Sequence, residues 1–265
     1  MCCCWRSSVK VSVITINFNS QDGFGRTHSS VRAQTYPDLE WVVIDSVSTD
    51  DSAAAVRAAT PDIDTLVVEK DDGIADAFNK GIALATGEAT VFLNAGDTFS
   101  SPEALAQMVA AWNQDKYDWL CAGAHFMQNG QIAFTRDLTT LPVDALVMRG
   151  CLIVHPSVIL KTVLLRSFSG YDARYRSAMD FDLWVRLISR GFLPQQSALI
   201  TSNFYLGGTS TSYSGFAEEL QSLTNNGLAR RRDLMLMRIR KAVVTRLGAL
   251  RRYRALYRLK ERLFR

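Results

Sequence analysis

The chain has 265 residues, of which 48% are hydrophobic and 21% are charged. This composition excludes a disordered or collagen-like protein, and the length favours one large domain, with or without an appendage, over two full domains. The net charge of +4 conceals an asymmetry, because residues 230–265 carry 14 Lys or Arg against Asp233 and Glu261.

Short apolar runs alternate with helical segments over the first hundred residues. The runs predict strands at residues 9–16, 40–45, 66–68 and 89–93. Helices are predicted between them at residues 30–34, 53–59 and 74–85, and side-chain oxygens of residues 48–52 are expected to cap the second helix. This alternation predicts an α/β fold with a parallel sheet covered on both faces.

The pattern changes after Pro102, where a helix is predicted at residues 103–113 and short strands and turns at residues 119–135. A less regular second half is therefore expected. We predict that residues 1–8 are disordered, that residues 9–227 form one domain and that residues 228–265 form a helical tail. Within the domain, residues 9–100 would bind the nucleotide and residues 101–227 the acceptor.

Polar side chains gather where the predicted strands end. Asn17, Asp45, residues 69–72 and residues 94–97 all follow strands, and parallel sheets bind ligands outside the carboxyl ends of their strands. Carboxylates there could hold a hard divalent cation or accept hydrogen bonds from a nucleotide. For a single Asp, a helix cap or a solvated loop position is the more common role.

Five segments carry motifs in a recognisable order: VSVITINFN at residues 11–19, VVIDSVSTDDS at 42–52, EKDDGIADAFNKG at 69–81, FLNAGD at 92–97 and GYDARYRSAMDFDLW at 170–184. Together they resemble glycosyltransferase family 2, which includes bacterial enzymes that build cell-surface glycans and glycolipids. The resemblance implies the GT-A fold, with a Rossmann-like, mostly parallel sheet flanked by helices. It also implies inverting transfer of a hexosyl or deoxyhexosyl group from a nucleotide-diphosphate sugar.

The resemblance implies a role for each matching residue. Asp180 would be the catalytic base, and Asp97 would hold Mn²⁺ or Mg²⁺. The residues expected to bind the nucleotide-sugar donor are Thr15, Asn17, Asn19, Asp45, Asp71, Gly73, Asp76, Asn79, Asn94 and His155.

Two positions depart from the family pattern, since Ala95 and Gly96 precede Asp97 and Met179 precedes Asp180. Asp182 is expected to be structural. His155 fits a donor ligand or a satisfied structural residue equally well. Residues 207–211 fit a closing loop or an ordinary turn.

The tail carries apolar residues at steps of three and four, with arginines over the remaining circumference. This pattern predicts a basic amphipathic helix. We expect residues 230–265 to bind an anionic membrane surface rather than nucleic acid or a protein, because a lipid-linked acceptor would also require the membrane. The protein would then be cytoplasmic and peripheral on the inner face of the cell membrane.

Two other functions fit parts of the pattern. A sugar nucleotidyltransferase would show a glycine-rich phosphate loop with Arg and Lys after the first strand, where residues 17–25 are followed only by Arg26. A non-catalytic scaffold is favoured only by Ala95 and Gly96. The sequence therefore favours an inverting glycosyltransferase that acts on a lipid-linked or glycan acceptor in cell-surface polysaccharide or glycolipid biosynthesis.

Overall fold

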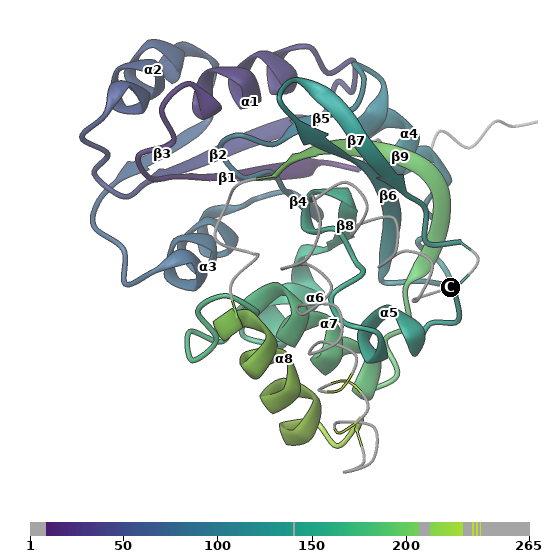
Figure 1. The fold of residues 1–265 in the computed structure, drawn as a ribbon. Coiled ribbons are helices and arrows are strands. Elements are labelled where there is room, and N and C mark those ends of the chain that lie inside the picture. The colour runs from purple at the N-terminus through teal and green to yellow at the C-terminus, as the bar shows by residue number, and fades with distance from the viewer. Residues whose placement is uncertain are drawn as a thin grey trace, which may run out of the picture.

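The computed structural model describes residues 9–139, 141–206 and 213–229, together with Met235, Met237 and Ile239. The described chain forms an α/β domain in which helices flank one curled sheet (Figure 1). The strand order is β3-β2-β1-β4-β8-β6-β9-β5, and β7 pairs with β6. These findings confirm the α/β prediction.

The strands and helices have the following bounds. The strands are β1 (Val11–Asn17), β2 (Leu39–Asp45), β3 (Thr65–Val68), β4 (Ala89–Phe92), β5 (Thr98–Phe99), β6 (Trp119–Gln128), β7 (Gln131–Arg136), β8 (Val158–Lys161) and β9 (Gln195–Tyr205). The α-helices are α1 (Gly23–Arg32), α2 (Asp51–Ala59), α3 (Ile74–Leu84), α4 (Ala104–Ala111), α5 (Ala145–Met148), α6 (Thr162–Ser167), α7 (Met179–Ser189) and α8 (Tyr213–Asn225). Two 3₁₀ helices are η1 (Thr60–Asp62) and η2 (His155–Ser157).

The first half of the sheet is parallel, as the alternating pattern predicts. β1 pairs in parallel with β2 and β4, and β2 pairs in parallel with β3. Beyond β4 the sheet is mixed: β8 is antiparallel to both β4 and β6, whereas β9 is parallel to β6. The sequence did not predict β8 or β9.

Strand β1 is rich in apolar residues because both of its faces are buried. Val13 packs with Phe24 of α1 and Val56 of α2, while Ile14 packs on the other face with Phe78 of α3. Figure 1 shows α1 and α2 on one side of the sheet and α3, α6 and α7 on the other. Successive residues of one strand thus supply two cores.

A buried carboxylate stabilises the amino ends of β1 and β2. Glu40 accepts hydrogen bonds from the hydroxyls of Ser12 and Thr86 and from the Thr86 backbone N–H, at 2.8 Å for the last. Burial alone would raise the pKa of Glu40, but these bonds and Lys10 lower it to about 2. The ionised carboxylate therefore acts as a structural acceptor at this edge.

One local prediction needed correction, and another is confirmed. Helix α1 begins at Gly23 rather than near residue 30. Residues 21–23 have the composition of a loop, but Phe24, Thr27 and Val31 are buried at helical spacing, and this packing extends the helix toward its N-terminus. The cap of α2 is confirmed, since Asp50 accepts a hydrogen bond from the Ser52 backbone N–H at 3.0 Å.

Several predictions fall outside the described part of the chain: disorder of residues 1–8, the loop at residues 207–211 and nearly all of the tail. The division into two halves stays a prediction. Among the residues that are described, no helix is both long enough and apolar enough to cross a membrane.

The fold generates a prediction about the contact between α3 and β1. A Cβ atom at Gly81 would lie inside van der Waals contact with Ile14, which is fully buried and β-branched. We expect Gly81→Ala to lower the melting temperature, because overpacking costs about 1–3 kcal/mol and exceeds the helix-propensity gain of up to about 1 kcal/mol. Gly25→Ala in α1 is the matched control, since nothing lies within 4 Å of its Cβ position. An equal or higher melting temperature for Gly81→Ala would contradict this packing.

Candidate active site

The structure brings Asn17 and Asp45 together at the carboxyl ends of β1 and β2. They are register partners, and the Asn17 Nδ2 donates to Asp45 Oδ2 at 2.5 Å. The other carboxylate oxygen, Oδ1, accepts from the Ser48 backbone N–H at 2.8 Å. Asp45 is only 2% exposed. This carboxylate is therefore held rigidly at the strand edge.

The loops that leave these strands have unusual backbone angles. Asn19 has φ 47° and its side-chain oxygen accepts from the Thr49 backbone N–H at 2.8 Å. Val47 has φ 56°, which a β-branched residue rarely adopts. Such strain often accompanies a functional site.

Phe18 is a residue that the sequence reasoning did not select. Its ring is 64% exposed between Asn17 and Asn19, and an exposed aromatic residue at this edge could stack on a flat ligand. The sequence feature that could have indicated it is a single large apolar residue among the polar residues that follow the first predicted strand.

Acids at the start of α3 surround one lysine. Lys80 Nζ lies 2.6 Å from Asp71, 2.8 Å from Glu69 and 3.2 Å from Asp76. The Asp71 side chain is 4% exposed, and its second oxygen has no hydrogen-bond partner among the described residues. Gly73 permits the chain to enter α3 with φ 118°. Asp71, Gly73 and Asp76 thus lie together, as predicted.

Asn94 and Asp97 follow β4 and present oxygen atoms. Asn94 Oδ1 is buried without a hydrogen-bond partner in the described structure. Asp97 Oδ1 accepts from the Tyr205 backbone N–H at 3.0 Å. Burial raises the pKa of Asp97 to about 7, against the opposing effects of that hydrogen bond and of the charge on Arg26. Amide and carboxylate oxygens are the ligands that Mg²⁺ and Mn²⁺ prefer, so these two residues fit a divalent cation.

No set of three or more His, Cys, Asp or Glu side chains in the described ranges is arranged to hold a metal ion. A cation at Asp97 would therefore require additional ligands from a substrate or from water. This agrees with the presence of Ala95 and Gly96 where the family pattern has a further acid.

Thr15, Asn79 and His155, like Asn17 and Asp45, have side chains that are bonded inside the protein. Thr15 accepts from the indole of Trp41 at 3.0 Å in the core. Asn79 donates to the Tyr171 carbonyl at 2.9 Å and accepts from the Tyr171 N–H at 2.8 Å. His155 bonds to the Tyr171 hydroxyl at 2.7 Å and stacks on Phe92. These side chains connect neighbouring elements of the fold.

Asp180 lies in the first turn of α7 and interacts electrostatically with Tyr171. Burial raises the pKa of Asp180 to about 6, although backbone N–H groups of Phe181 and of Asp180 itself oppose the rise. The Cys151 thiol lies 4.0 Å from its Oδ2. A carboxylate with a pKa near neutrality can accept a proton efficiently.

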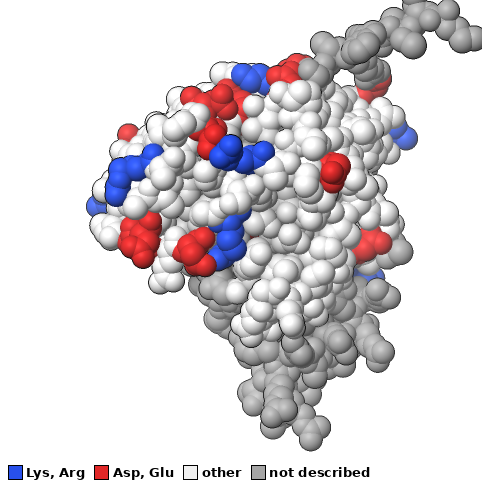
Figure 2. All heavy atoms as spheres, turned by 90° about the horizontal axis from the view of Figure 1, so that it is seen from above, with Lys and Arg blue, Asp and Glu red and all other residues white. Residues whose placement is uncertain are grey.

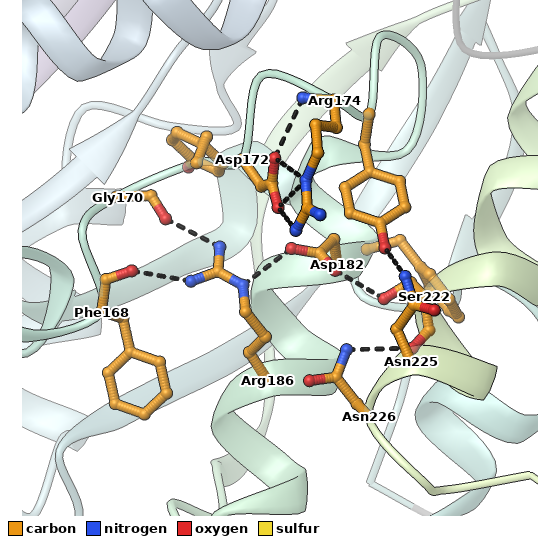
Figure 3. A network of polar contacts seen from close by, with 12 residues as sticks. Phe168, Gly170, Asp172, Arg174, Asp182, Arg186, Ser222, Asn225 and Asn226 are labelled. Atoms are coloured by element: carbon orange, nitrogen blue, oxygen red, sulfur yellow. Dashed lines mark hydrogen bonds and ion pairs between the residues drawn. The ribbon is translucent and has the colours of Figure 1, made fainter.

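Asp182 has a different environment, which Figure 3 shows. Its Oδ2 pairs with Arg186 Nε at 2.7 Å, and its Oδ1 accepts from the Ser222 hydroxyl at 2.7 Å. Arg186 also donates to the carbonyls of Phe168 and Gly170. Both oxygens of Asp182 are therefore occupied, which agrees with the structural role expected of it.

The face that Figure 2 presents carries charges of both signs side by side over the described residues. The described part of this face therefore lacks a broad area of one charge.

The profile of Glycosyl transferase family 2 matches residues 12–148, slightly more than half of the chain. The chain belongs to this family. The matched residues include Asn17, Asp45 and Asp97, and Asp180 lies outside the matched range.

Relatives of this family 2 protein occur in mycobacteria. An uncharacterised glycosyltransferase of Mycobacterium tuberculosis is 46% identical over 106 residues, which cover 40% of this chain and 40% of the relative. The alignment therefore spans about two fifths of that relative's length. A PGL/p-HBAD biosynthesis glycosyltransferase of the same species is 26% identical over 229 residues, covering 84% of this chain and 87% of the relative.

Among solved structures, the mannosyltransferase PcManGT of Pyrobaculum calidifontis, in complex with GDP-Man and Mn²⁺, superposes with a TM-score of 0.64. It is 20% identical, and the match covers 96% of this chain and 79% of that protein. This similarity supports the fold alone and confirms the expected GT-A architecture.

The buried position of His155 in this family 2 domain generates a prediction. Burial lowers the pKa of His155 to about 3, whereas an unfolded histidine has a pKa of about 6.5. The unfolded chain therefore binds a proton that the folded ring does not, so the folded state loses stability as the pH falls below about 6.5. In an NMR titration, the His155 ring should stay neutral from pH 8 to pH 5. A midpoint near 6.5 would instead place the ring in contact with solvent or an acidic partner.

Proposed function

We propose that this protein transfers a sugar from a nucleotide-diphosphate sugar to a hydroxyl group of a lipid-linked or glycan acceptor, with inversion at the anomeric carbon. The observation that carries the proposal is the Asp180 carboxylate, which has a pKa of about 6 at the start of α7. It interacts with Tyr171, which is fixed by Asn79 of the α3 motif. The base and the strand-end residues therefore belong to one connected framework.

The nucleotide would bind at the ends of β1 and β2. Asp45 would accept an N–H group of the base through a remaining lone pair of its carboxylate, since each oxygen already accepts one hydrogen bond. The exposed Phe18 would stack on the base. Asp71 offers an acceptor oxygen that has no partner within the described protein. The GDP-Man complex of PcManGT supports a donor of this chemical class.

Asn94 and Asp97 would hold Mn²⁺ or Mg²⁺ against the donor diphosphate. Their oxygen chemistry supports this assignment, as does Mn²⁺ in the PcManGT complex. Negative charge on the departing diphosphate would be neutralised by the bound cation.

Asp180 would act as the general base in a single displacement. Its carboxylate takes the proton of the acceptor hydroxyl while that oxygen forms a bond to the anomeric carbon. The bond between this carbon and the diphosphate oxygen breaks, and the nucleoside diphosphate leaves with the electron pair. Attack from the face opposite the leaving group inverts the configuration.

The acceptor is proposed to be lipid-linked. A relative named for PGL/p-HBAD biosynthesis supports a glycolipid pathway in the cell envelope. The basic tail would place the protein on the inner, anionic face of the cell membrane, where such an acceptor is found. Nucleic acid is not a proposed partner.

Replacement of the base provides the test of this mechanism. Asp180→Asn keeps the shape of the side chain but removes its basicity, so kcat should fall by about 10²- to 10⁴-fold. Release of nucleoside diphosphate would be measured with UDP-, GDP- and dTDP-sugars and Mn²⁺, and donor affinity by calorimetry. In the unaltered protein, kcat should rise with pH through about 6, because the base is active only when ionised.

Asp182→Asn is the control within the same helix. It should lower thermal stability, because Arg186 and Ser222 lose a charged partner, yet it should retain turnover at temperatures where it is folded. Near-normal turnover in Asp180→Asn would rule out the displacement described above. Greater loss of turnover in folded Asp182→Asn would move the base to Asp182.

Membrane docking is tested with the full-length chain. Replacement of Arg251, Arg252, Arg254 and Arg258 by Gln should reduce co-sedimentation with phosphatidylserine vesicles, because each basic residue near such a surface contributes about 1 kcal/mol. Binding of the unaltered protein should weaken as salt is added. Equal sedimentation of both proteins would remove the tail from this role.

A further inference from the structure

Helix α7 begins without a cap of its own. Its N-cap residue is Ala178, whose side chain cannot accept a hydrogen bond. Helix N-termini leave backbone N–H groups unsatisfied and carry partial positive charge. Asp180 lies two residues further along, so the position of the base depends on how this end of the helix is held.

A carboxylate from α8 occupies that end. Glu218 Oε2 accepts hydrogen bonds from the backbone N–H groups of Ser177 at 2.7 Å and of Ala178 at 2.9 Å. The two helices are therefore joined by a charged residue that lies 40 positions after Ala178 in sequence. Glu218 therefore holds the two residues that lead into α7, while the Phe181 N–H in the first turn is accepted by the Asp180 carboxylate itself.

Further contacts hold α8 against α7 and the segment before it, as Figure 3 shows. Ser222 donates to Asp182, and Asn225 donates to the Tyr175 hydroxyl at 3.0 Å. Leu223 is fully buried in the core that contains Trp184 of α7. The docking of α8 thus has several anchors, of which only Glu218 contacts the end that carries the base.

We infer that Glu218 is a positioning residue for the base: its carboxylate holds the backbone of Ser177 and Ala178, which leads into the first turn of α7, and its negative charge lies at the helix end that carries Asp180. This inference rests on the proposed function, in which Asp180 removes the acceptor proton. Glu218 itself contacts no reacting atom in this arrangement.

The charge has a predictable effect on Asp180. A nearby carboxylate disfavours ionisation of a second one and makes that second group a stronger base. It also offsets the positive end of the α7 dipole, which would otherwise favour the ionised form. Within the described structure, Cys151 contacts Asp180 and Tyr171 interacts with it electrostatically. Glu219 of α8 lies against Gly150, the neighbour of Cys151, while Asp182 and Arg186 of α7 pair with each other.

Glu218→Gln separates geometry from charge, because its amide oxygen can still accept from the backbone N–H groups. We expect the acid limb of the kcat profile to move to lower pH by about 0.5 to 1 pH unit. We also expect kcat on the plateau to fall by about 3- to 10-fold as the base weakens, with KM for the donor unchanged. Glu218→Ala, which removes the acceptor as well, should lose more kcat.

Ser222→Ala is the matched control, since it weakens another contact of α8 without changing charge near Asp180. It should lower the melting temperature and leave the midpoint of the acid limb in place. A carboxyl ¹³C NMR titration, with the Asp180 signal assigned by its loss in Asp180→Asn, gives a readout independent of turnover. The Asp180 midpoint should lie near 6 in the unaltered protein and lower in Glu218→Gln.

The possible outcomes are distinct. An unmoved NMR midpoint in folded Glu218→Gln overturns the inference, as does an equal shift in Ser222→Ala. Absence of sugar transfer by the unaltered protein with every donor would instead refute the proposed function, and the NMR titration would then decide the link between Glu218 and Asp180 separately.

Discussion

The amide of Asn79 provides the connection on which the arrangement of the site depends. It bonds to both the N–H and the C=O of Tyr171, which is 92 residues away in sequence. Tyr171 in turn bonds to His155 and interacts with Asp180. The close approach requires glycine at position 170, where φ is 63° and a Cβ atom would meet the Asn79 side chain. One side-chain amide therefore sets the distance between the α3 motif and the base helix.

The parallel half of the fold could be predicted because its strands are largely apolar runs and because a helix follows each of β1, β2 and β3. In the second half, the predicted helix at residues 103–113 and strands at residues 119–135 correspond to α4, β6 and β7. Strands β8 and β9 were not predicted, because their pairings join distant and dissimilar segments. Strand β9 is an example: Gln195–Tyr205 is mostly half-buried and mixes polar with apolar residues, so its sequence has no clear period. Its place beside β6 depends on tertiary packing.

The order of motifs predicted which residues gather at the strand ends, and the structure places Asn17 with Asp45 and Asp71 with Asp76 as expected. The order of motifs did not predict the direction of individual side chains. Thr15 follows the apolar face of β1 to Trp41, and His155 is surrounded by aromatic rings that keep it neutral. The role of Glu218 could not be predicted from the sequence, because a residue that bonds to the end of another helix has no fixed sequence spacing from that end.

The two edges of the sheet differ in how freely their residues can change. At the amino ends of β1 and β2, Ser12, Glu40 and Thr86 satisfy one another, so replacing any one leaves a buried polar group unpaired. At the carboxyl ends, Asn94 presents a free acceptor within the described structure and Phe18 is exposed. Substitution of Phe18, or loss of the Asn94 side-chain oxygen, would remove no hydrogen bond of the described structure, whereas Asn17 and Asp45 at the same ends bond to each other. Ligand preference can therefore diverge among proteins built on this scaffold while the opposite edge preserves their stability.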